Sequence, residues 1–232
     1  MKSQHIPKHI AIIMDGNRRW AREHNLPVLE GHRRVANSIL EPLIKHASEM
    51  GIQYLTFWAW STENWNRDIG EVKGIMNLLQ WGFGHFGEKL HKNGVRIRMI
   101  GDISKFDHNI QRQITALIEK TKNNTAITAI FALNYGGRDE MLRAIAKWHK
   151  DQKNETREIT SNEFSQYLDT TGIPDPELIV RTGGEKRLSG FLLWQSEYSE
   201  LYFADWHMPD FTVTRFDEIV GDFELRQRRF GK

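Results

Sequence analysis

Three short segments of the chain combine arginines, glycines and small polar residues, and each directly follows an apolar run. Residues 15–19 (DGNRR) follow IAIIM, residues 61–67 (STENWNR) follow LTFWAW, and residues 181–187 (RTGGEKR) follow LIV. Glycine lets backbone N–H groups approach phosphate oxygens, and an arginine fork binds phosphate through two hydrogen bonds. Asp15 supplies a carboxylate of the kind that holds Mg²⁺ beside phosphate oxygens. Together these residue types predict a magnesium-dependent site for a diphosphate.

Other phosphate and metal chemistries are not indicated. The chain has neither GxxxxGK[ST] nor GxGxxG, so it is no Walker-type NTPase and carries no dinucleotide fingerprint. No second carboxylate stands beside Asp15, which argues against two-metal hydrolysis. The ten histidines show no HExxH or paired ligand spacing. A lone Asp at a strand end is more often a cap or turn residue, so the arginine-rich segments are what favour a binding role.

The elements that must position these segments alternate along the chain. Short β-branched or aromatic runs predict strands, and longer amphipathic stretches predict helices between them. The predicted strands are 9–14, 54–60, 95–100, 127–133, 178–180 and 200–204, and the predicted helices lie near 31–50, 71–93, 107–122, 137–150, 161–169 and 214–228. This alternation predicts one α/β domain over residues 1–232, with a mainly parallel six-stranded sheet flanked by helices. In such a sheet, ligands bind beyond the carboxyl ends of the strands.

The composition excludes several classes of protein. There are no cysteines, which excludes disulfides, cysteine-ligated metals and a thiol nucleophile. The formal net charge is only +2, so no nucleic-acid partner is indicated. No apolar run is long enough to cross a membrane, and the N-terminal run is too short for a signal peptide. We expect a cytoplasmic protein with at most peripheral membrane contact.

Several motifs, in order along residues 5–231, resemble the cis-prenyltransferases, the undecaprenyl diphosphate synthase family. They are IAIIMDGNRRWA at 10–21, Gly31-His32, WSTENWNR at 60–67, NYGGR at 134–138, RTGGEKRLS at 181–189 and RFG at 229–231. The combination of MDGNxRxA with RTGGExRxS is very specific. The resemblance implies a homodimeric, Mg²⁺-dependent enzyme that ionises an allylic diphosphate. A second isoprenoid diphosphate then attacks the allylic cation and a proton is lost.

The same resemblance implies a role for individual residues. Asp15 matches the metal-binding and ionising residue, and His32, Ser61 and Asn64 match residues near the reacting groups. The remaining substrate-binding positions implied are Gly16, Asn17, Arg18, Arg19, Trp20, Trp60, Arg67, Glu71, Arg181, Arg187, Ser189, Arg229 and Gly231. Glu200 matches a supporting metal-site or interface residue. The proton acceptor stays open among His32, Asn64 through a water, Ser61 and the released diphosphate.

The chain departs from the family pattern at the first diphosphate cradle. Val28 stands where members often have an arginine and Arg18 where they often have glycine, which alters the geometry of the cradle more than its charge. In the segment 181–187, Lys186 stands where histidine is frequent, which replaces a possible acid–base group by a point charge.

Bulky aromatic residues also fall where long-chain members line the elongation cavity with slim side chains. They are Trp58, Trp60, Trp81, Phe83 and Phe86, with Leu133 at the floor, whereas Trp65 is expected to be ordinary core. Close-packed walls yield little, so we expect a ten- to fifteen-carbon product. Irregular coupling of two dimethylallyl diphosphates, to a lavandulyl or cyclolavandulyl skeleton, is one form of this expectation. The alternatives are a long-chain synthase that uses farnesyl and isopentenyl diphosphates, and a non-catalytic partner subunit.

Overall fold

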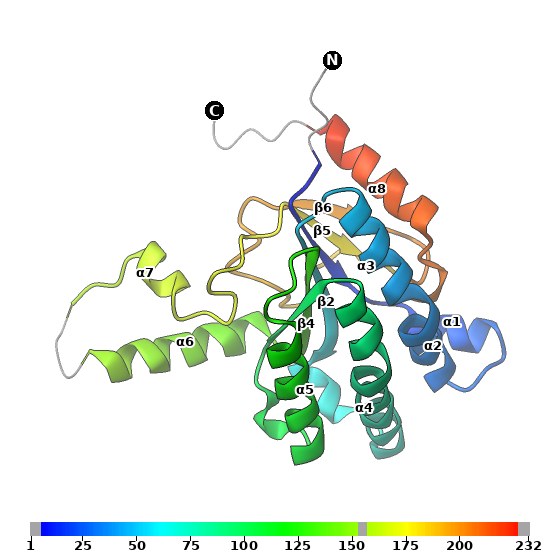
Figure 1. Cartoon of the computed structure of the whole chain (residues 1–232), viewed down its shortest axis with the longest axis horizontal. Coiled ribbons are helices and arrows are strands. Elements are labelled where there is room, and N and C mark those ends of the chain that lie inside the picture. The colour runs from blue at the N-terminus through cyan, green and yellow to red at the C-terminus, as the bar shows by residue number, and fades with distance from the viewer. Residues whose placement is uncertain (1–5, 153–156, 227–232) are drawn as a thin grey trace.

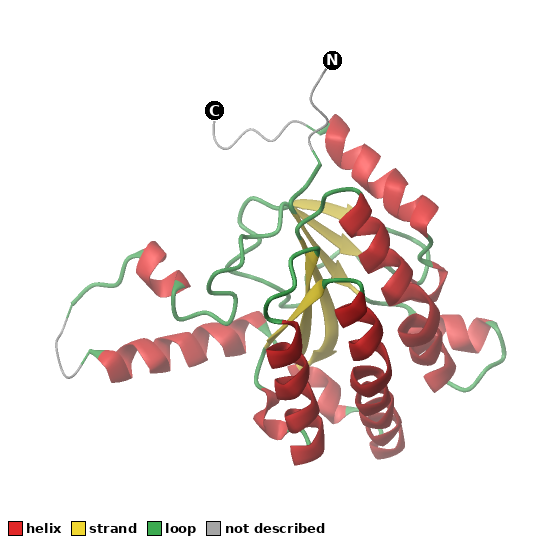
Figure 2. Cartoon of the chain, viewed as in Figure 1, coloured by secondary structure: helices red, strands yellow, loops and turns green. Residues whose placement is uncertain are grey.

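The computed structural model describes residues 6–152 and 157–226, which form a six-stranded sheet covered by helices (Figures 1 and 2). The strands are β1 (His9–Ile13), β2 (Tyr54–Ser61), β3 (Val95–Ile100), β4 (Ile127–Tyr135), β5 (Leu178–Arg181) and β6 (Glu200–Phe203). They lie in the order β3-β4-β2-β1-β5-β6, and every neighbouring pair is parallel. The predicted fold class is therefore confirmed. None of the described helices is both long and apolar enough to span a bilayer.

The central strand β1 is apolar throughout because it is buried on both faces. Ile10 and Ile12 pack with Leu43 and other side chains of the helices that cover one face. Ala11 and Ile13 pack on the other face with a cluster that includes Phe191. An alternating pattern would have placed polar side chains in one of these two cores.

The helices match most of the predicted stretches. They are α1 (Asn17–Glu23), α2 (Leu29–Arg34), α3 (Leu40–Glu49), α4 (Ile69–Lys92), α5 (His108–Thr121), α6 (Gly137–Asp151), α7 (Ser161–Ser165) and α8 (Val213–Leu225). Helix α1 was not among the predicted helices. Its seven residues include two consecutive arginines and give only a short apolar stripe, so the segment resembles a polar loop.

The predicted single helix over 31–50 is interrupted. A π-helical turn, Val35–Ile39, connects α2 to α3. Pro42 lies in the first turn of α3 and has no N–H to donate to the carbonyl group of Ser38. The wider turn directly before it accommodates this missing hydrogen bond. Such turns are often found at functional sites, and this one faces a cavity described below.

A β-bulge near the end of β2 redirects one indole. The pairing with β4 shifts between Trp58 and Trp60, so the usual alternation of side chains is broken there. Trp58 stacks on Phe191, with ring centroids 5.0 Å apart, in the core on one face. Trp60 packs in the core on the other face, together with Ile75 of α4. Without the extra residue, both indoles would lie on the same face.

His9 predicts how the stability of this fold depends on pH. It is buried, its Nδ1 lies 2.7 Å from the carbonyl oxygen of Pro174, and burial lowers its pKa from 6.5 to about 4. Between pH 6.5 and pH 4, His9 therefore binds a proton in the unfolded chain but not in the folded chain. The free energy of unfolding decreases as the pH falls through this range. We expect His9 to contribute about 2 kcal/mol to this loss at pH 5.

Urea unfolding of His9→Gln at pH 7 and pH 5 tests this. The variant should be less stable at pH 7 but show a smaller difference between the two pH values. His149→Gln, at an exposed position on α6, is the control and should keep the wild-type difference. An unchanged difference in His9→Gln would contradict the assignment.

Candidate active site

Asp15 and Arg181 meet where the direction of strand addition reverses. From β1 the chain adds β2 on one side and later β5 on the other, so the ends of β1 and β5 form a topological switch point. An Arg181 Nη2–H donates to Asp15 Oδ2 over 2.9 Å, and the Arg181 side chain is only 6% exposed. Burial by itself raises the pKa of Asp15, but the hydrogen bonds from Arg181 and the Gly16 N–H outweigh it and lower that pKa. Asp15 is therefore ionised at neutral pH.

Thr182 and Gly183 fix the backbone around Asp15. The Thr182 hydroxyl donates to the carbonyl oxygen of Asp15 over 2.7 Å and accepts the Asp15 N–H over 3.0 Å. Gly183 has a φ of 87°, and a Cβ there would stand 3.1 Å from the Asp15 carbonyl carbon. Only glycine combines this backbone conformation with this close approach. The sequence places both residues in the site segment 181–187 but gives neither an individual role, because their effect depends on contacts between loops far apart in the sequence.

Helix α1 supplies the residues after Asp15. Gly16 adopts a φ of 97°, and Asn17 is buried with its Oδ1 lacking a hydrogen-bond partner. Arg19 lies 3.2 Å from Asp15 Oδ1 and reaches towards Glu185 at 4.0 Å. Helix α1 thus adds one cation beside the Asp15 carboxylate and one unpaired amide oxygen to the cavity lining described below.

Arg18 points to a different partner from Arg19. Its Nε lies 3.6 Å from Glu71 of α4, and Arg67 donates to the same carboxylate over 2.9 Å. The guanidinium of Arg67 also lies 5.7 Å from the Trp60 ring centroid, in a cation–π arrangement. Glu71 therefore connects α1 to the segment after β2 and holds two arginines beside the site.

Ser61 and Asn64 hold each other in place after β2. The Ser61 N–H donates to Asn64 Oδ1 over 3.0 Å, and the Ser61 side chain accepts the Asn64 N–H, which completes a capping box at the start of the 3₁₀ turn Thr62–Asn66. This arrangement leaves the Asn64 amide N–H₂ and the Ser61 hydroxyl proton available to a ligand.

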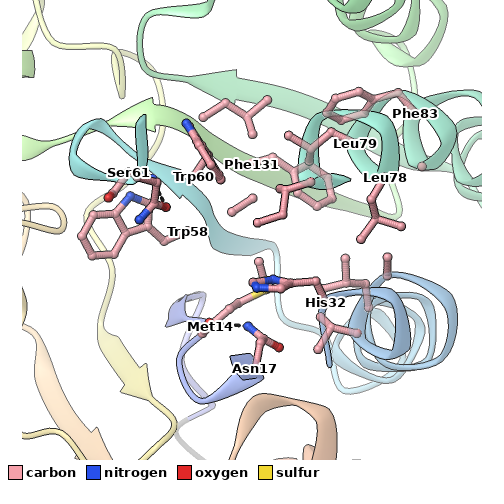
Figure 3. A pocket seen from close by; sticks show the side chains of 18 of the residues that line it. Met14, Asn17, His32, Trp58, Trp60, Ser61, Leu78, Leu79, Phe83 and Phe131 are labelled. Atoms are coloured by element: carbon pink, nitrogen blue, oxygen red, sulfur yellow. Dashed lines mark hydrogen bonds between the residues drawn. The ribbon is translucent and has the colours of Figure 1, made fainter. Parts of the chain in front are cut away.

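His32 faces the same space from α2. Burial, followed by the charges of Arg67 and Arg18, lowers its pKa to about 4, so the ring is neutral at pH 7. Its Nε2 is buried without a hydrogen-bond partner. Figure 3 shows the ring pointing into a cavity, beside Met14.

A cavity of about 400 Å³ begins at these polar groups and continues into an apolar interior. Figure 3 shows Asn17 and His32 on one side of it and Trp60, Leu79 and Phe131 on the other. The predicted site residues that line it are Asp15, Asn17, His32, Trp60, Ser61, Asn64, Arg67, Arg181 and Ser189. The structure therefore joins a charged mouth to a hydrocarbon-compatible pocket, which is the shape that an amphiphilic diphosphate requires.

Several predicted binding residues lie elsewhere. Trp20 is buried outside the cavity, where its indole N–H donates to Asp210 over 2.9 Å, and its role in substrate binding stays a prediction. Arg187 does not line the cavity, but it lies at its rim: its exposed side chain pairs with Glu185, and its carbonyl oxygen accepts a hydrogen bond from Arg181. Arg229 and Gly231 lie outside the described residues.

Glu200 lies at the wrong end of the sheet to share a metal with Asp15 of the same chain. It pairs in register with Leu178 at the start of β5, whereas Arg181, beside Asp15, ends that strand. Glu200 instead forms an ion pair with Arg226 over 3.2 Å. Within one chain the two carboxylates do not converge, so the role of Glu200 as a supporting metal-site or interface residue stays a prediction for the dimer.

The aromatic residues divide into two groups. Trp60, Phe83, Phe86 and Leu133 line the cavity as predicted. Trp58 also borders the cavity, but its indole stacks on Phe191 in the core on the other face of the sheet. Trp81 does not: it is 43% exposed on the outer side of α4 and stacks on His85, so its predicted place in the cavity wall is wrong. Helical periodicity explains the difference, because Trp81 lies between the inward-facing positions of α4.

The opposite wall was missed by the sequence analysis. It is formed by Val35, Ala36, Leu40, Glu41 and Ile44, from the π-helical turn and α3. An amphipathic stripe predicts a buried helix face but does not tell whether that face meets a core or a cavity.

Comparisons with known proteins agree with this geometry. The family described as "Putative undecaprenyl diphosphate synthase" matches residues 13–231. An isoprenyl transferase of Clostridium perfringens is 44% identical over 97% of this chain and 90% of its own length. The "Ditrans,polycis-undecaprenyl-diphosphate synthase ((2E,6E)-farnesyl-diphosphate specific)" of Micrococcus luteus is 42% identical over 97% of this chain and 92% of its own length.

Two solved structures are also similar. Lavandulyl diphosphate synthase from Lavandula x intermedia, in complex with dimethylallyl diphosphate, has a TM-score of 0.94 and 32% identity over 98% of this chain and 99% of that chain. A "probable undecaprenyl diphosphate synthase" from Campylobacter jejuni has a TM-score of 0.79 and 37% identity over 97% of this chain and 99% of that chain. The fold, the diphosphate-type site at the β1–β5 switch point and these matches identify the chain as a member of the cis-prenyltransferase family and an enzyme that transfers prenyl groups.

Proposed function

We propose that the protein is a Mg²⁺-dependent synthase of short prenyl diphosphates, of ten to fifteen carbons. It would join an allylic substrate, dimethylallyl or geranyl diphosphate, to a second five-carbon isoprenoid diphosphate. The observation that carries the proposal is a continuous cavity that runs from the Asp15–Arg181 pair to an apolar end at Ile44 and Leu90.

The depth of this cavity supports a short product. Its lining includes Ile97, which is level with Ile10 through the register of β3, β4, β2 and β1. From Ile10 to Asp15, five residues at about 3.3 Å each span about 17 Å. One isoprenoid unit extends about 5 Å, given carbon–carbon bonds of about 1.5 Å. About three units therefore fit between the mouth and the far end.

The residues at the mouth suit the ionisation of an allylic diphosphate. Arg181 and Arg19 are already held beside Asp15, so positive charge is in place where the leaving diphosphate gains negative charge. Asp15 is a single carboxylate, and Mg²⁺ commonly binds one or two carboxylates together with substrate phosphates, so the donor set fits this ion. When bound, Mg²⁺ would neutralise part of the developing charge. The apolar walls would exclude water from the allylic cation.

The second substrate has two candidates. The similarity to lavandulyl diphosphate synthase, and Arg18 held by Glu71 in an altered cradle, favour irregular coupling of two dimethylallyl diphosphates. The curated relatives favour regular addition of isopentenyl diphosphate, and a long-chain product is their corresponding alternative.

Product analysis tests the proposal directly. Purified protein with Mg²⁺ and dimethylallyl diphosphate, with and without isopentenyl diphosphate, should yield alcohols of ten or fifteen carbons after dephosphorylation, identified by mass spectrometry against standards. A product without isopentenyl diphosphate establishes irregular coupling. Products of many isoprenoid units would overturn the short-product proposal, and binding without turnover would indicate a non-catalytic partner subunit.

Asp15→Asn tests the mouth of the site. The change keeps the shape of the side chain but removes its charge, and we expect turnover to fall by about 10²–10³. Asp102→Asn is the matched control: Asp102 follows β3 at the same edge of the sheet but caps a short turn outside the cavity. Circular dichroism should show both variants folded. If Asp15→Asn kept one tenth or more of the wild-type rate, Asp15 would have no place in the mechanism.

We also propose that the protein is a cytoplasmic homodimer. Helices α6 and α7 extend away from the sheet (Figure 1), and Leu142 and Ile145 on α6 are 68% and 48% exposed. Exposed apolar side chains on a projecting helix are typical of an interface. The lack of cysteines is compatible with a reducing compartment.

Light scattering of the double variant Leu142→Glu/Ile145→Glu tests the homodimer. The two introduced carboxylates would be buried at the interface, so the double variant should be a monomer. Leu26→Glu, which changes another exposed leucine, is the control and should stay dimeric. A dimer in the double variant would place the interface elsewhere.

A further inference from the structure

Asn134 is a buried polar residue that the site described above does not use. It belongs to the NYGGR segment at the end of β4, is 2% exposed and has a φ of 47°. A positive φ is uncommon outside glycine, and asparagine is among the residues that tolerate it best. Such a backbone persists where the surrounding contacts hold it, and it is often found at functional sites. The contacts of Asn134 therefore indicate its role.

Asn134 is an extra residue in the pairing of β4 with β2. Its two neighbours in β4, Leu133 and Tyr135, pair with consecutive residues of β2, Trp60 and Ser61. Asn134 has no counterpart and forms a bulge, which offsets the earlier bulge in β2 and restores the original register at Ser61. Bulges next to active sites commonly redirect one side chain.

The side chain of Asn134 connects two segments that follow different strands. Its Oδ1 accepts the indole N–H of Trp65 over 2.7 Å, and its Nδ2 donates to the carbonyl oxygen of Asp102 over 2.8 Å. Trp65 belongs to the 3₁₀ turn after β2, and Asp102 follows β3. Because both ends of the amide are bonded, its orientation is fixed, and so is the position of the indole relative to β4.

Trp65 lies beside the polar residues of the site. Its ring meets the Trp60 ring edge-on, with centroids 5.3 Å apart, and Trp60 lines the cavity. Asn64 directly precedes Trp65 and forms the capping box with Ser61. A shift of the Trp65 indole would therefore move the amide of Asn64 and the hydroxyl of Ser61 with it.

The backbone after Asn134 supports the opposite end of the same turn. A Cβ at Gly136 would stand 2.7 Å from Thr62 Oγ1, so a larger residue there would push the turn away. The NYGGR segment thus contacts the turn at both ends, through Asn134 at Trp65 and through Gly136 at Thr62.

We propose that Asn134 is a positioning residue for prenyl transfer, which acts through Trp65 to hold Ser61 and Asn64 in place at the cavity mouth. The inference rests on the proposed prenyl diphosphate synthase activity. Asn134 does not itself line the cavity. Its effect on the rate is indirect, and a displacement of about 1 Å at a reacting group can cost about 100-fold.

Hydrogen exchange tests the contact separately from turnover. In protein isotope-labelled at the tryptophan indoles, the NMR signal lost in Trp65→Phe identifies the Trp65 N–H. Its exchange should be slow in wild type and at least tenfold faster in Asn134→Gly. Glycine accepts the positive φ, so this variant removes the side-chain bonds without adding backbone strain. Unchanged exchange in folded Asn134→Gly would overturn the proposal.

Turnover tests the consequence for the reaction. The kcat of Asn134→Gly should fall at least tenfold, with the substrates that the wild type couples. Trp65→Phe, which removes the donor of the same hydrogen bond, should also lower kcat. The double variant should fall no further than the slower single variant, because both changes break one contact. Fully additive losses, or a wild-type kcat in Asn134→Gly, would contradict the proposed role.

Thr56→Val is the matched control for loss of a buried hydrogen bond. Thr56 lies on β2 and bonds His9 Nε2 over 2.7 Å, but it does not line the cavity. The variant should unfold at a lower temperature and keep kcat within twofold of wild type. An equal fall of kcat in Thr56→Val would indicate a general effect of stability and overturn the proposal. Absence of turnover in wild type would overturn the proposed function instead, while the exchange experiment would still decide whether Asn134 holds Trp65.

Discussion

The ion pair between Asp15 and Arg181 is the interaction on which the site depends. Arg181 is buried, and a buried guanidinium that loses its carboxylate costs about 3–5 kcal/mol. The pair is possible only because β1 and β5 are neighbours with the register Ile13 opposite Arg181. The Thr182 hydroxyl then locks the Asp15 backbone from the β5 side. One register thus fixes the carboxylate, its cation and the loops that carry the remaining arginines.

The second constraint is the separation of charge from hydrocarbon. The arginines stay at the carboxyl edge of the sheet, while the cavity behind them is bounded by Phe83, Phe86 and Leu133. Two local irregularities shape its walls. The bulge in β2 turns Trp60 towards α4, and the π-helical turn before Pro42 places Val35 and Ala36 on the opposite wall. Each departs from regular geometry beside the site, where such departures are common.

The residues whose side chains lie away from their expected places share one physical cause. Trp20, Trp81 and Glu200 have side chains suited to the expected role, but their direction is set by packing that no short motif contains. Trp81 lies on the outer side of α4, Trp20 bonds Asp210, and Glu200 starts a strand whose opposite end faces the site. The resemblance to a family supplied residue types and positions along the chain but not the side of the element from which each points.

The amino-acid sequence by itself determined the strands, most of the helices and the diphosphate chemistry. Apolar runs such as IAIIM can only be buried on both faces, and the arginine- and glycine-rich segments that follow them have no comparable use in a core. Tertiary structure decided the rest: that Asp15 meets Arg181, that Glu71 holds Arg18 and Arg67 together, and that the cavity ends at Ile44 and Leu90. These depend on strand order and helix separation. Both are set by the packing of the whole core, because residues far apart in the sequence must fill the same space.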